Sequence, residues 1–300
     1  MTARELAKDP HILPAEDGLY TNVLDLHYHQ WDAISQTALK TFEIAPAKYK
    51  EEKDNPPEIT PQKQQNFDFG SAIHMAVLQP DELDKWFRPR PEGHPNSNAY
   101  KDRVAAMLAD NPFLRILKGD NYDALPRIRD AVWSNPDAAA LLEGAEVEQS
   151  GVATDPTYGF RAKFRLDIRN PSLGVLADLK STTDARPEHF GRQMEDLRYY
   201  RQAAFYIRYS ALLGLPERDF AVIAIEKDPP YLTWVHQVPD KWLVAGEEEM
   251  DLLLERYAEC ERLDVWPGYP GGLHELQPTD WQMKSLELRI EALRGLGVAA

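Results

Sequence analysis

A strand–turn–strand pattern in residues 160–180 constrains the fold of this chain more than any other stretch. The first run, residues 160–168, alternates polar and apolar side chains, which is typical of a half-buried strand. An Asn-Pro-Ser sequence supplies turn chemistry, and residues 175–179 then form a second, mostly apolar run. The pattern predicts a β-hairpin whose first strand carries its polar side chains on one face: Arg161, Lys163, Arg165 and Asp167.

Two acids of this hairpin are placed to converge. Asp178 interrupts the apolar second strand, and burying an acid there is costly unless it is paired or binds a metal. Lys180 follows two residues later, so both side chains point to one face. If the turn has an even number of residues, Asp167 lies on that same face, diagonally across the hairpin. The sequence therefore predicts two carboxylates and a lysine around one spot.

This trio has the composition of a metal-dependent phosphodiesterase site. Phosphodiester hydrolysis needs a deprotonated water and stabilisation of the phosphate charge, which Mg²⁺ held by carboxylates supplies. A nearby lysine can orient the attacking water. The same acid-x-lysine spacing also occurs at residues 51–53, in a predicted loop. The trio alone leaves open a second interpretation, a solvated salt bridge between Asp178 and Lys180 at a strand end.

Four further residues could join this site, and each also has a purely structural interpretation. His74 lies in an otherwise apolar helical segment and could be a core histidine. Glu148 opens the strand before the hairpin and could be an edge charge. Gln202 and Tyr206 are four apart on a predicted helix after the hairpin, so they share one face, which could simply pack. Taken singly, each residue is better explained by structure than by catalysis.

Composition narrows the class of protein. The net charge of −15 argues against broad adhesion to nucleic acid, although a local basic face and bound cations can reverse the field at one site. The single cysteine, Cys260, excludes an internal disulfide and a cysteine-rich metal site. The N-terminus has no apolar signal core, and no apolar run spans a bilayer. We therefore expect a cytoplasmic protein with no membrane partner.

The order of predicted elements indicates one domain behind an N-terminal arm. Residues 1–30 show few periodic signals and are predicted to be extended. Residues 31–145 are predicted to be mainly helical, and residues 146–264 to form a core of strand, strand, strand, helix, strand, strand, helix. Residues 265–300 form a C-terminal extension. The expected fold class is α/β (α+β), with a mixed central sheet flanked by helices and a helical N-terminal part.

Taken together, these residues resemble the RecB-type branch of the PD-(D/E)XK nucleases. The shared order is His, Glu, Asp, Asp-x-Lys and Gln-x-x-x-Tyr. The flanking sequence is more similar still to the phage and prophage exodeoxyribonuclease VIII (RecE-type) nuclease domain. The resemblance covers most of residues 25–215, in the segments ISQTALKTFEIAPAKYK (34–50), FGSAIHMAVLQPDEL (69–83), VEQSGVATDPTYGFRAKFRLDI (147–168), VLADLKSTTDARPEHF (175–190) and YYRQAAFYIRYSALLG (199–214).

The sequence departs from the family pattern in two places. Leu166 stands where the family usually has a proline before the first aspartate. This puts little in doubt, because a backbone proline carries no chemistry. The segment WPGYPGGLHELQPTDW (266–281) matches only loosely, which leaves the C-terminal boundary of the resemblance open.

The resemblance implies a restriction-endonuclease-like core and a role for each candidate residue. The implied Mg²⁺ ligands, for which Mn²⁺ could substitute, are His74, Asp167, Asp178 and the main-chain carbonyl of Leu179. Glu148 would bind the metal or support its ligands. Lys180 would position the nucleophilic water, and Gln202 and Tyr206 would hold that lysine or the DNA backbone. We add a further expectation, either a phosphate-tracking stripe or simply an exposed basic strand face, for Arg161, Lys163 and Arg165.

The activity implied by the resemblance is a Mg²⁺-dependent exodeoxyribonuclease acting on double-stranded DNA ends, 5′ to 3′, in phage-type recombination. Its implied partners are a protein that anneals single strands and further copies of the chain in a ring, in the cytoplasm of a bacterial host. Two alternatives stay open. One is another RecB-like repair or single-strand nuclease. The other, of a different class, is a catalytically silent DNA-binding or assembly protein on the same fold.

Overall fold

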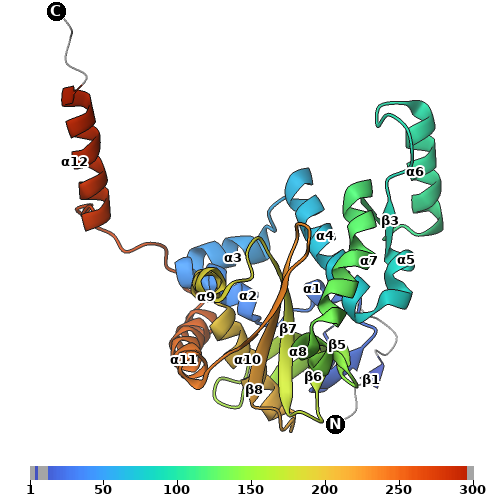
Figure 1. Cartoon of the computed structure of the whole chain (residues 1–300). Helices are drawn as coiled ribbons and strands as arrows, with labels where there is room; N and C mark the ends of the chain where they lie inside the picture. The colour runs from blue at the N-terminus through green and yellow to red at the C-terminus, as the bar shows by residue number, and fades with distance from the viewer. Residues whose placement is uncertain (1–3, 6–12, 296–300) are drawn as a thin grey trace, which may run out of the picture. The chain divides into compact units, whose positions relative to one another are not determined.

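A computed structural model describes residues 4–5 and 13–295 of the chain (Figure 1). Part of the predicted N-terminal arm, residues 1–3 and 6–12, and the last residues of the predicted extension, 296–300, lie outside the described residues. The chain divides into two compact units, residues 1–266 and residues 267–300. The sheet and all candidate site residues belong to the first unit.

The first unit contains a seven-stranded sheet in the order β1-β2-β5-β6-β7-β8-β9. Only the pairs β1–β2 and β7–β8 are parallel. Together with the flanking helices, this mixed sheet confirms the predicted fold class. The strands are β1 (Arg4–Glu5), β2 (Gly18–Thr21), β5 (Glu146–Thr154), β6 (Arg161–Asn170), β7 (Val175–Thr182), β8 (Asp219–Glu226) and β9 (Thr233–Gln237).

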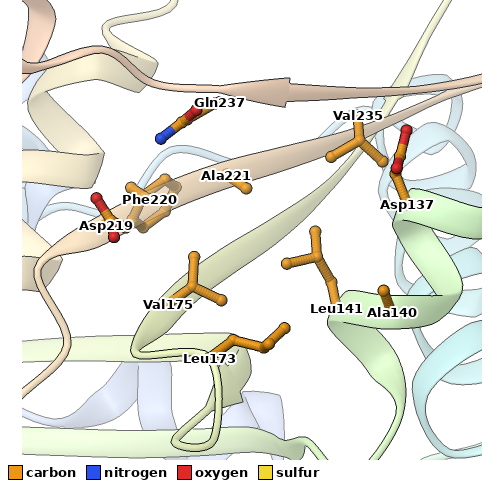
Figure 2. Close-up of a pocket in the computed structure, with 10 residues that line it drawn as sticks. All are labelled: Asp137, Ala140, Leu141, Leu173, Val175, Asp219, Phe220, Ala221, Val235 and Gln237. Carbon is orange, nitrogen blue, oxygen red and sulfur yellow. The ribbon is translucent and has the colours of Figure 1, made fainter.

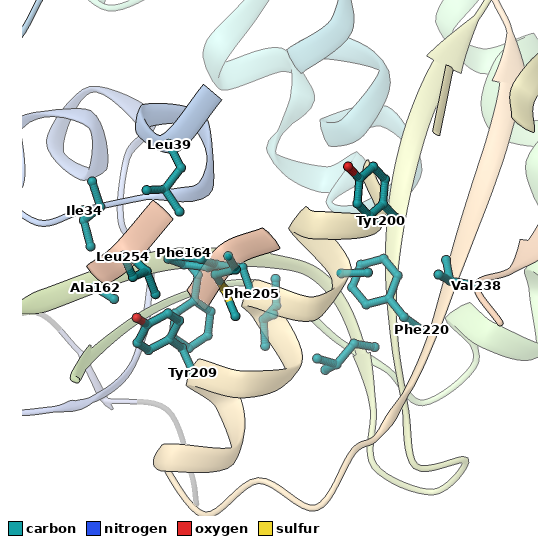
Figure 3. Packing of buried hydrophobic residues seen from close by; sticks show 14 of the residues in the cluster. Ile34, Leu39, Ala162, Phe164, Tyr200, Phe205, Tyr209, Phe220, Val238 and Leu254 are labelled. Atoms are coloured by element: carbon teal, nitrogen blue, oxygen red, sulfur yellow. The ribbon is translucent and has the colours of Figure 1, made fainter. Parts of the chain in front are cut away.

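Two apolar clusters sandwich the sheet. Alternate residues of β7 and β8 enter one cluster or the other, because successive side chains of a strand point to opposite faces. The first cluster, partly shown in Figure 3, packs the sheet against α2 (Gln36–Ile44), α3 (Pro46–Asp54), α9 (Pro187–Asp196), α10 (Tyr199–Leu212) and α11 (Asp240–Leu263). The second cluster packs it against α4 (Pro61–Leu78), α7 (Gly119–Ser134) and α8 (Pro136–Leu142).

The N-terminal segment is more structured than the predicted extended arm. Within residues 13–31 the chain forms β2, which pairs with β5, and α1 (Asp25–Gln30). Both elements are tied to the sheet by a small cluster of Tyr20, Val23, Trp31 and Val152, all buried. The sequence shows only short apolar runs here, and their burial depends on a partner strand more than a hundred residues away.

The helical part also differs in detail from the prediction. Helix α4 begins at Pro61, because Thr60 caps it by accepting a hydrogen bond from the Lys63 amide and proline is favourable in the first turn. A small two-stranded sheet, which the sequence did not predict, joins β3 (Phe87–Pro89) to β4 (Arg115–Leu117). The remaining elements of this part are η1 (Pro80–Glu82), α5 (Leu83–Trp86) and α6 (Asn98–Asp110).

In the described part of the second unit, residues 267–295, the chain forms helix α12 (Asp280–Gly295). Several of its large apolar side chains are exposed, among them Trp281 and Leu293. Across the described part of the chain, no helix has both the length and the apolar character needed to cross a bilayer.

Candidate functional site

The two aspartates of the central hairpin lie together on adjacent strands. The β6–β7 ladder pairs Ile168 with Ala177, so continuing that register places Asp167 directly opposite Asp178 rather than diagonally across, as the sequence analysis expected. Both residues are buried, and their carboxyl groups lie within hydrogen-bonding reach of each other. The Leu179 amide donates a 2.9 Å hydrogen bond to Asp167 Oδ2, which fixes the first carboxylate against the second strand.

The regular alternation of side chains along strand β6 is interrupted at the site. Ala162, Phe164 and Leu166 of β6 enter the first apolar cluster, whereas Ile168 enters the second. Regular alternation would keep all four on one side, so the alternation shifts by one at Asp167. On β5, Glu148 occupies the position opposite Asp167 in the register and has a left-handed φ of +52°. A non-glycine residue in this conformation is strained, and such strain is concentrated at functional sites.

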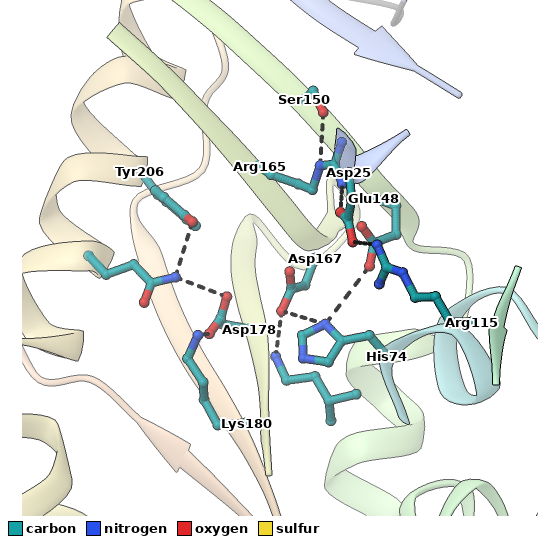
Figure 4. Close-up of polar contacts among 12 residues, drawn as sticks. Asp25, His74, Arg115, Glu148, Ser150, Arg165, Asp167, Asp178, Lys180 and Tyr206 are labelled. Carbon is teal, nitrogen blue, oxygen red and sulfur yellow. Dashed lines mark hydrogen bonds and ion pairs between the residues drawn. The ribbon is translucent and has the colours of Figure 1, made fainter. Parts of the chain in front are cut away.

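His74 joins the site from helix α4. Neighbouring residues Ala72, Ile73, Ala76 and Val77 are buried in the second cluster, and this packing holds the imidazole beside the central strands β5 and β6. His74 Nδ1 lies 3.4 Å from Asp167 Oδ2 and 3.9 Å from Glu148 Oε1. Ligand atoms of His74, Glu148 and Asp167 all lie within 4.8 Å of one another, a spacing that could hold one metal ion (Figure 4).

The pKa values of the acidic side chains at this site are raised, because several carboxyl groups are crowded together and buried. Burial, and then the charge of Asp167, raise the pKa of Asp178 to about 7. Burial, again followed by Asp167, raises the pKa of Glu148 to about 8. Burial lowers the pKa of His74, so its imidazole is neutral and has a free lone pair at neutral pH. Crowded carboxyls beside a neutral histidine are a donor set that fits a divalent cation.

Lys180 and two side chains of α10 surround the second aspartate. Lys180 forms an ion pair with Asp178, and burial opposes the charged lysine less than the two aspartates favour it, so its pKa is raised. Gln202 Nε2 donates to Asp178 Oδ1 at 3.3 Å and to the Tyr206 hydroxyl at 3.1 Å. The structure thus brings together the acid, the lysine and the glutamine–tyrosine face that the sequence singled out.

A cavity of about 670 Å³ opens onto the candidate metal-ligand cluster, which consists of His74, Glu148 and Asp167. Asp25 of α1 stands between two of its arginines, pairing with Arg165 and lying 3.4 Å from Arg115 Nη2 (Figure 4). The lining also includes Trp86 and Phe113, with Phe113 half exposed. Sequence analysis missed Asp25 and Arg115, because neither belongs to a motif and both reach the site only through the fold of distant segments.

The three basic residues of β6 in the predicted stripe, Arg161, Lys163 and Arg165, contact the N-terminal segment. Lys163 is buried, and its ammonium group donates to the main-chain carbonyls of Tyr28, His29 and Trp31. Arg161 binds the Pro14 carbonyl and pairs with Asp17. The exposed basic face that the sequence analysis considered is therefore absent in this arrangement of the described residues. Of the predicted stripe, Arg165 alone lines the cavity beside the ligand cluster.

A second hollow lies at the start of β7 and β8, beside α8 (Figure 2). Its lining is mainly apolar, with Leu141, Val175 and Val235 facing the space and Asp137 and Asp219 at its margins. None of the candidate site residues lines it. The candidate site residues therefore lie at and around the hairpin and not in this hollow.

The fold and the geometry of the site are those of the PD-(D/E)XK class of proteins. The comparison with known proteins agrees with this class. The model of the family described as "PDDEXK-like domain of unknown function (DUF3799)" matches residues 35–277, so the chain belongs to that family. A crystal structure from Eubacterium rectale, named as a candidate exonuclease, is similar with a TM-score of 0.55 at 14% identity. The alignment covers 85% of this chain and 93% of that one. No curated protein matches the sequence.

The raised pKa of Glu148 predicts how the metal-free protein responds to pH. In the unfolded chain this carboxyl titrates near 4.5, whereas in the fold it titrates near 8, so the folded state holds a proton that the unfolded state releases. The free energy of unfolding should therefore fall as pH rises from about 4.5 to 8, by several kcal/mol. Thermal melting in EDTA should show wild type losing stability over this range and Glu148→Gln losing less.

Added Mg²⁺ should reverse this loss in wild type, because the cation replaces the proton among the carboxylates. Glu146→Gln, a change on the same strand outside the ligand cluster, is the matched control. An identical pH dependence for Glu148→Gln and wild type would contradict the assignment.

We expect His74 to determine how strongly the site prefers Mn²⁺ over Mg²⁺. Nitrogen is a softer donor than oxygen, so a site that contains imidazole favours Mn²⁺ over Mg²⁺ more than a site of carboxylates alone. We expect His74→Ala to weaken binding of Mn²⁺ more than that of Mg²⁺, measured by calorimetric titration. His94→Ala, an exposed histidine outside the cluster, should bind both metals like wild type. Equal affinities in His74→Ala and wild type would make His74 a core residue.

Proposed function

We propose that this protein is a Mg²⁺-dependent exodeoxyribonuclease that hydrolyses phosphodiester bonds from the ends of double-stranded DNA, in the 5′ to 3′ direction. The observation that carries the proposal is the convergence of Asp167, Asp178 and Lys180 beside His74 and Glu148. A protein of the same fold that only binds DNA has no need to keep all of these groups, so an active nuclease is favoured over the silent alternative.

In this proposal His74, Asp167 and Asp178 hold the metal, with Glu148 binding or supporting it. We include the main-chain carbonyl of Leu179 as a further candidate ligand, because the backbone of this residue hydrogen-bonds His74. Bound Mg²⁺ would supply charge neutralisation on the phosphate and a lowered pKa for a bound water. Lys180, whose pKa is raised, would act as a charged donor that orients the attacking water rather than as a base.

The α10 side chains would hold this arrangement in place. Gln202 is anchored between Asp178 and Tyr206, so it fixes the carboxylate that also pairs with the lysine. Burial raises the pKa of Tyr206 well above its ordinary range, so its hydroxyl stays protonated and can donate to a phosphate oxygen. Arg165 is our remaining candidate for a phosphate contact from β6, provided that Asp25 releases it.

The test is a cleavage assay on linear duplex DNA labelled at either one 5′ end or one 3′ end, with Mg²⁺ present. Our proposal predicts early release of short products from the 5′-labelled end, and no cleavage of covalently closed circular DNA. Cleavage of single strands alone would favour the other RecB-like nucleases. Binding of duplex ends with no cleavage in Mg²⁺ or Mn²⁺ would favour the silent DNA-binding alternative.

The resemblance to recombination nucleases also motivates a proposal about partners and place. We propose that the protein acts as a homo-oligomeric ring in the cytoplasm of a bacterial host, together with a protein that anneals single strands. Light scattering of the purified protein gives its mass in solution and so tests the ring directly. A monomer at assay concentrations would contradict it.

A further inference from the structure

Lys40 occupies an unusual position beside the catalytic lysine. It lies on α2, which Ser35 caps and whose buried residues Leu39 and Phe42 fix the helix in the first cluster. Its ammonium group lies 5.5 Å from the centre of the Tyr199 ring. The ammonium group of Lys180 lies 4.8 Å from the centre of the same ring. Two cations therefore share one aromatic side chain at the edge of the candidate site.

The acids nearby are already engaged by other cations. Asp178 pairs with Lys180, and Glu43 pairs with both Arg198 and Arg201. Among residues 13–295, no ion pair or hydrogen bond is found for the Lys40 ammonium group, although the chain as a whole carries a net charge of −15. Burial, and then the charge of Lys180, lower the pKa of Lys40 to about 8. The Tyr199 ring offsets part of the cost of holding two cations together, and an arriving anion would stabilise this pair further.

Resting on the proposed nuclease function, we propose that Lys40 and the Tyr199 ring form a second phosphate-binding position, which holds a phosphate of the cleaved strand next to the one that Lys180 serves. Lys40, Tyr199 and Lys180 are each only partly buried, as contact with a DNA backbone requires. The aromatic ring stabilises both ammonium groups through cation–π contacts. No residue of α2 belongs to the metal-ligand cluster, so this position supplies binding rather than metal chemistry.

The test measures how binding of duplex DNA depends on salt. Each phosphate contact made by a lysine releases counterions, so losing one contact flattens the plot of log affinity against log salt by about 0.7–0.9. We expect Lys40→Met, in the Asp178→Asn background with Mg²⁺, to show this flatter slope and about tenfold weaker binding at low salt. Lys40→Arg should restore the slope, because it restores the charge.

The matched control is Lys50→Met on the adjacent helix α3. It removes the same formal charge, but Lys50 is only partly buried and pairs with Asp54, so the slope should stay that of the parent protein. Melting curves establish that each variant is folded. If Lys40→Met melts early, Lys40→Gln, which keeps a polar side chain without the charge, replaces it. An unchanged slope in the folded, uncharged variant would overturn the proposal.

Two further arms separate the possible results. Duplexes with a 5′-phosphate and with a 5′-hydroxyl distinguish a terminal phosphate from an internal one: loss of affinity for both indicates an internal phosphate, and loss only for the phosphorylated duplex indicates the terminal one. If wild type binds DNA without cleaving it, the nuclease proposal fails, yet the slopes still decide the role of Lys40. If wild type cleaves DNA and the slopes agree, only the Lys40 proposal fails.

Discussion

Asp178→Asn should reduce Mg²⁺-dependent cleavage of linear duplex DNA by at least about a thousandfold while leaving binding to DNA ends in place. The aspartate lies at the centre of the site, with Asp167 opposite, Lys180 paired to it and Gln202 bonded to it. Asparagine keeps the shape and the contact with Gln202 but removes a charge that a divalent cation needs. We therefore expect the substitution to reduce the rate of cleavage without disturbing the fold.

The same substitution should not destabilise the metal-free protein at neutral pH. Burial and the neighbouring Asp167 already raise the pKa of Asp178 to about 7, so roughly half of the molecules carry a proton there. Single-turnover cleavage and thermal melting, each with and without Mg²⁺, test both statements. Asp219→Asn, at the start of the neighbouring strand, is the matched control. Substantial Mg²⁺-dependent cleavage by Asp178→Asn would mean that the active site lies elsewhere.

Lys180→Met should slow the chemical step by a factor of about 10²–10⁴, the usual range for a positioned proton-transfer group, while metal binding stays close to that of wild type. Its ammonium group pairs with Asp178 and is fixed over Tyr199, so it can orient a water molecule at the metal site. Methionine fills the same space without a donor. Because the lysine is not a metal ligand, its replacement should remove an interaction with the reacting water and leave the metal ligands unchanged.

Removing the charge of Lys180 should also change the pKa of Asp178. Lys180 lowers the pKa of Asp178, so the variant should protonate that acid at a higher pH and bind Mg²⁺ with a steeper dependence on pH. Rapid-quench kinetics and calorimetric titration of Mg²⁺ separate the two effects. Lys227→Met, an exposed lysine just beyond the end of β8, should behave as wild type in both. Equal single-turnover rates for Lys180→Met and wild type would contradict the assigned role.

The central hairpin and its acids could be predicted because they depend on short-range patterns. Side chains two apart on a strand share a face, which places Asp178 with Lys180, and residues four apart on a helix are neighbours, which joins Gln202 to Tyr206. The mixed sheet followed from the order of strands and helices. These features require knowledge of only a few consecutive residues, so the sequence by itself determined them.

The tertiary structure decided which distant groups meet and which charges remain available. His74 reaches Asp167 only because the apolar face of α4 packs on the sheet, and Lys163 is removed from solvent because the segment around Trp31 folds over it. The same packing places Lys40 and Lys180 over one ring. Burial of apolar faces brings together residues that are far apart in the chain, and no local periodicity encodes those distances.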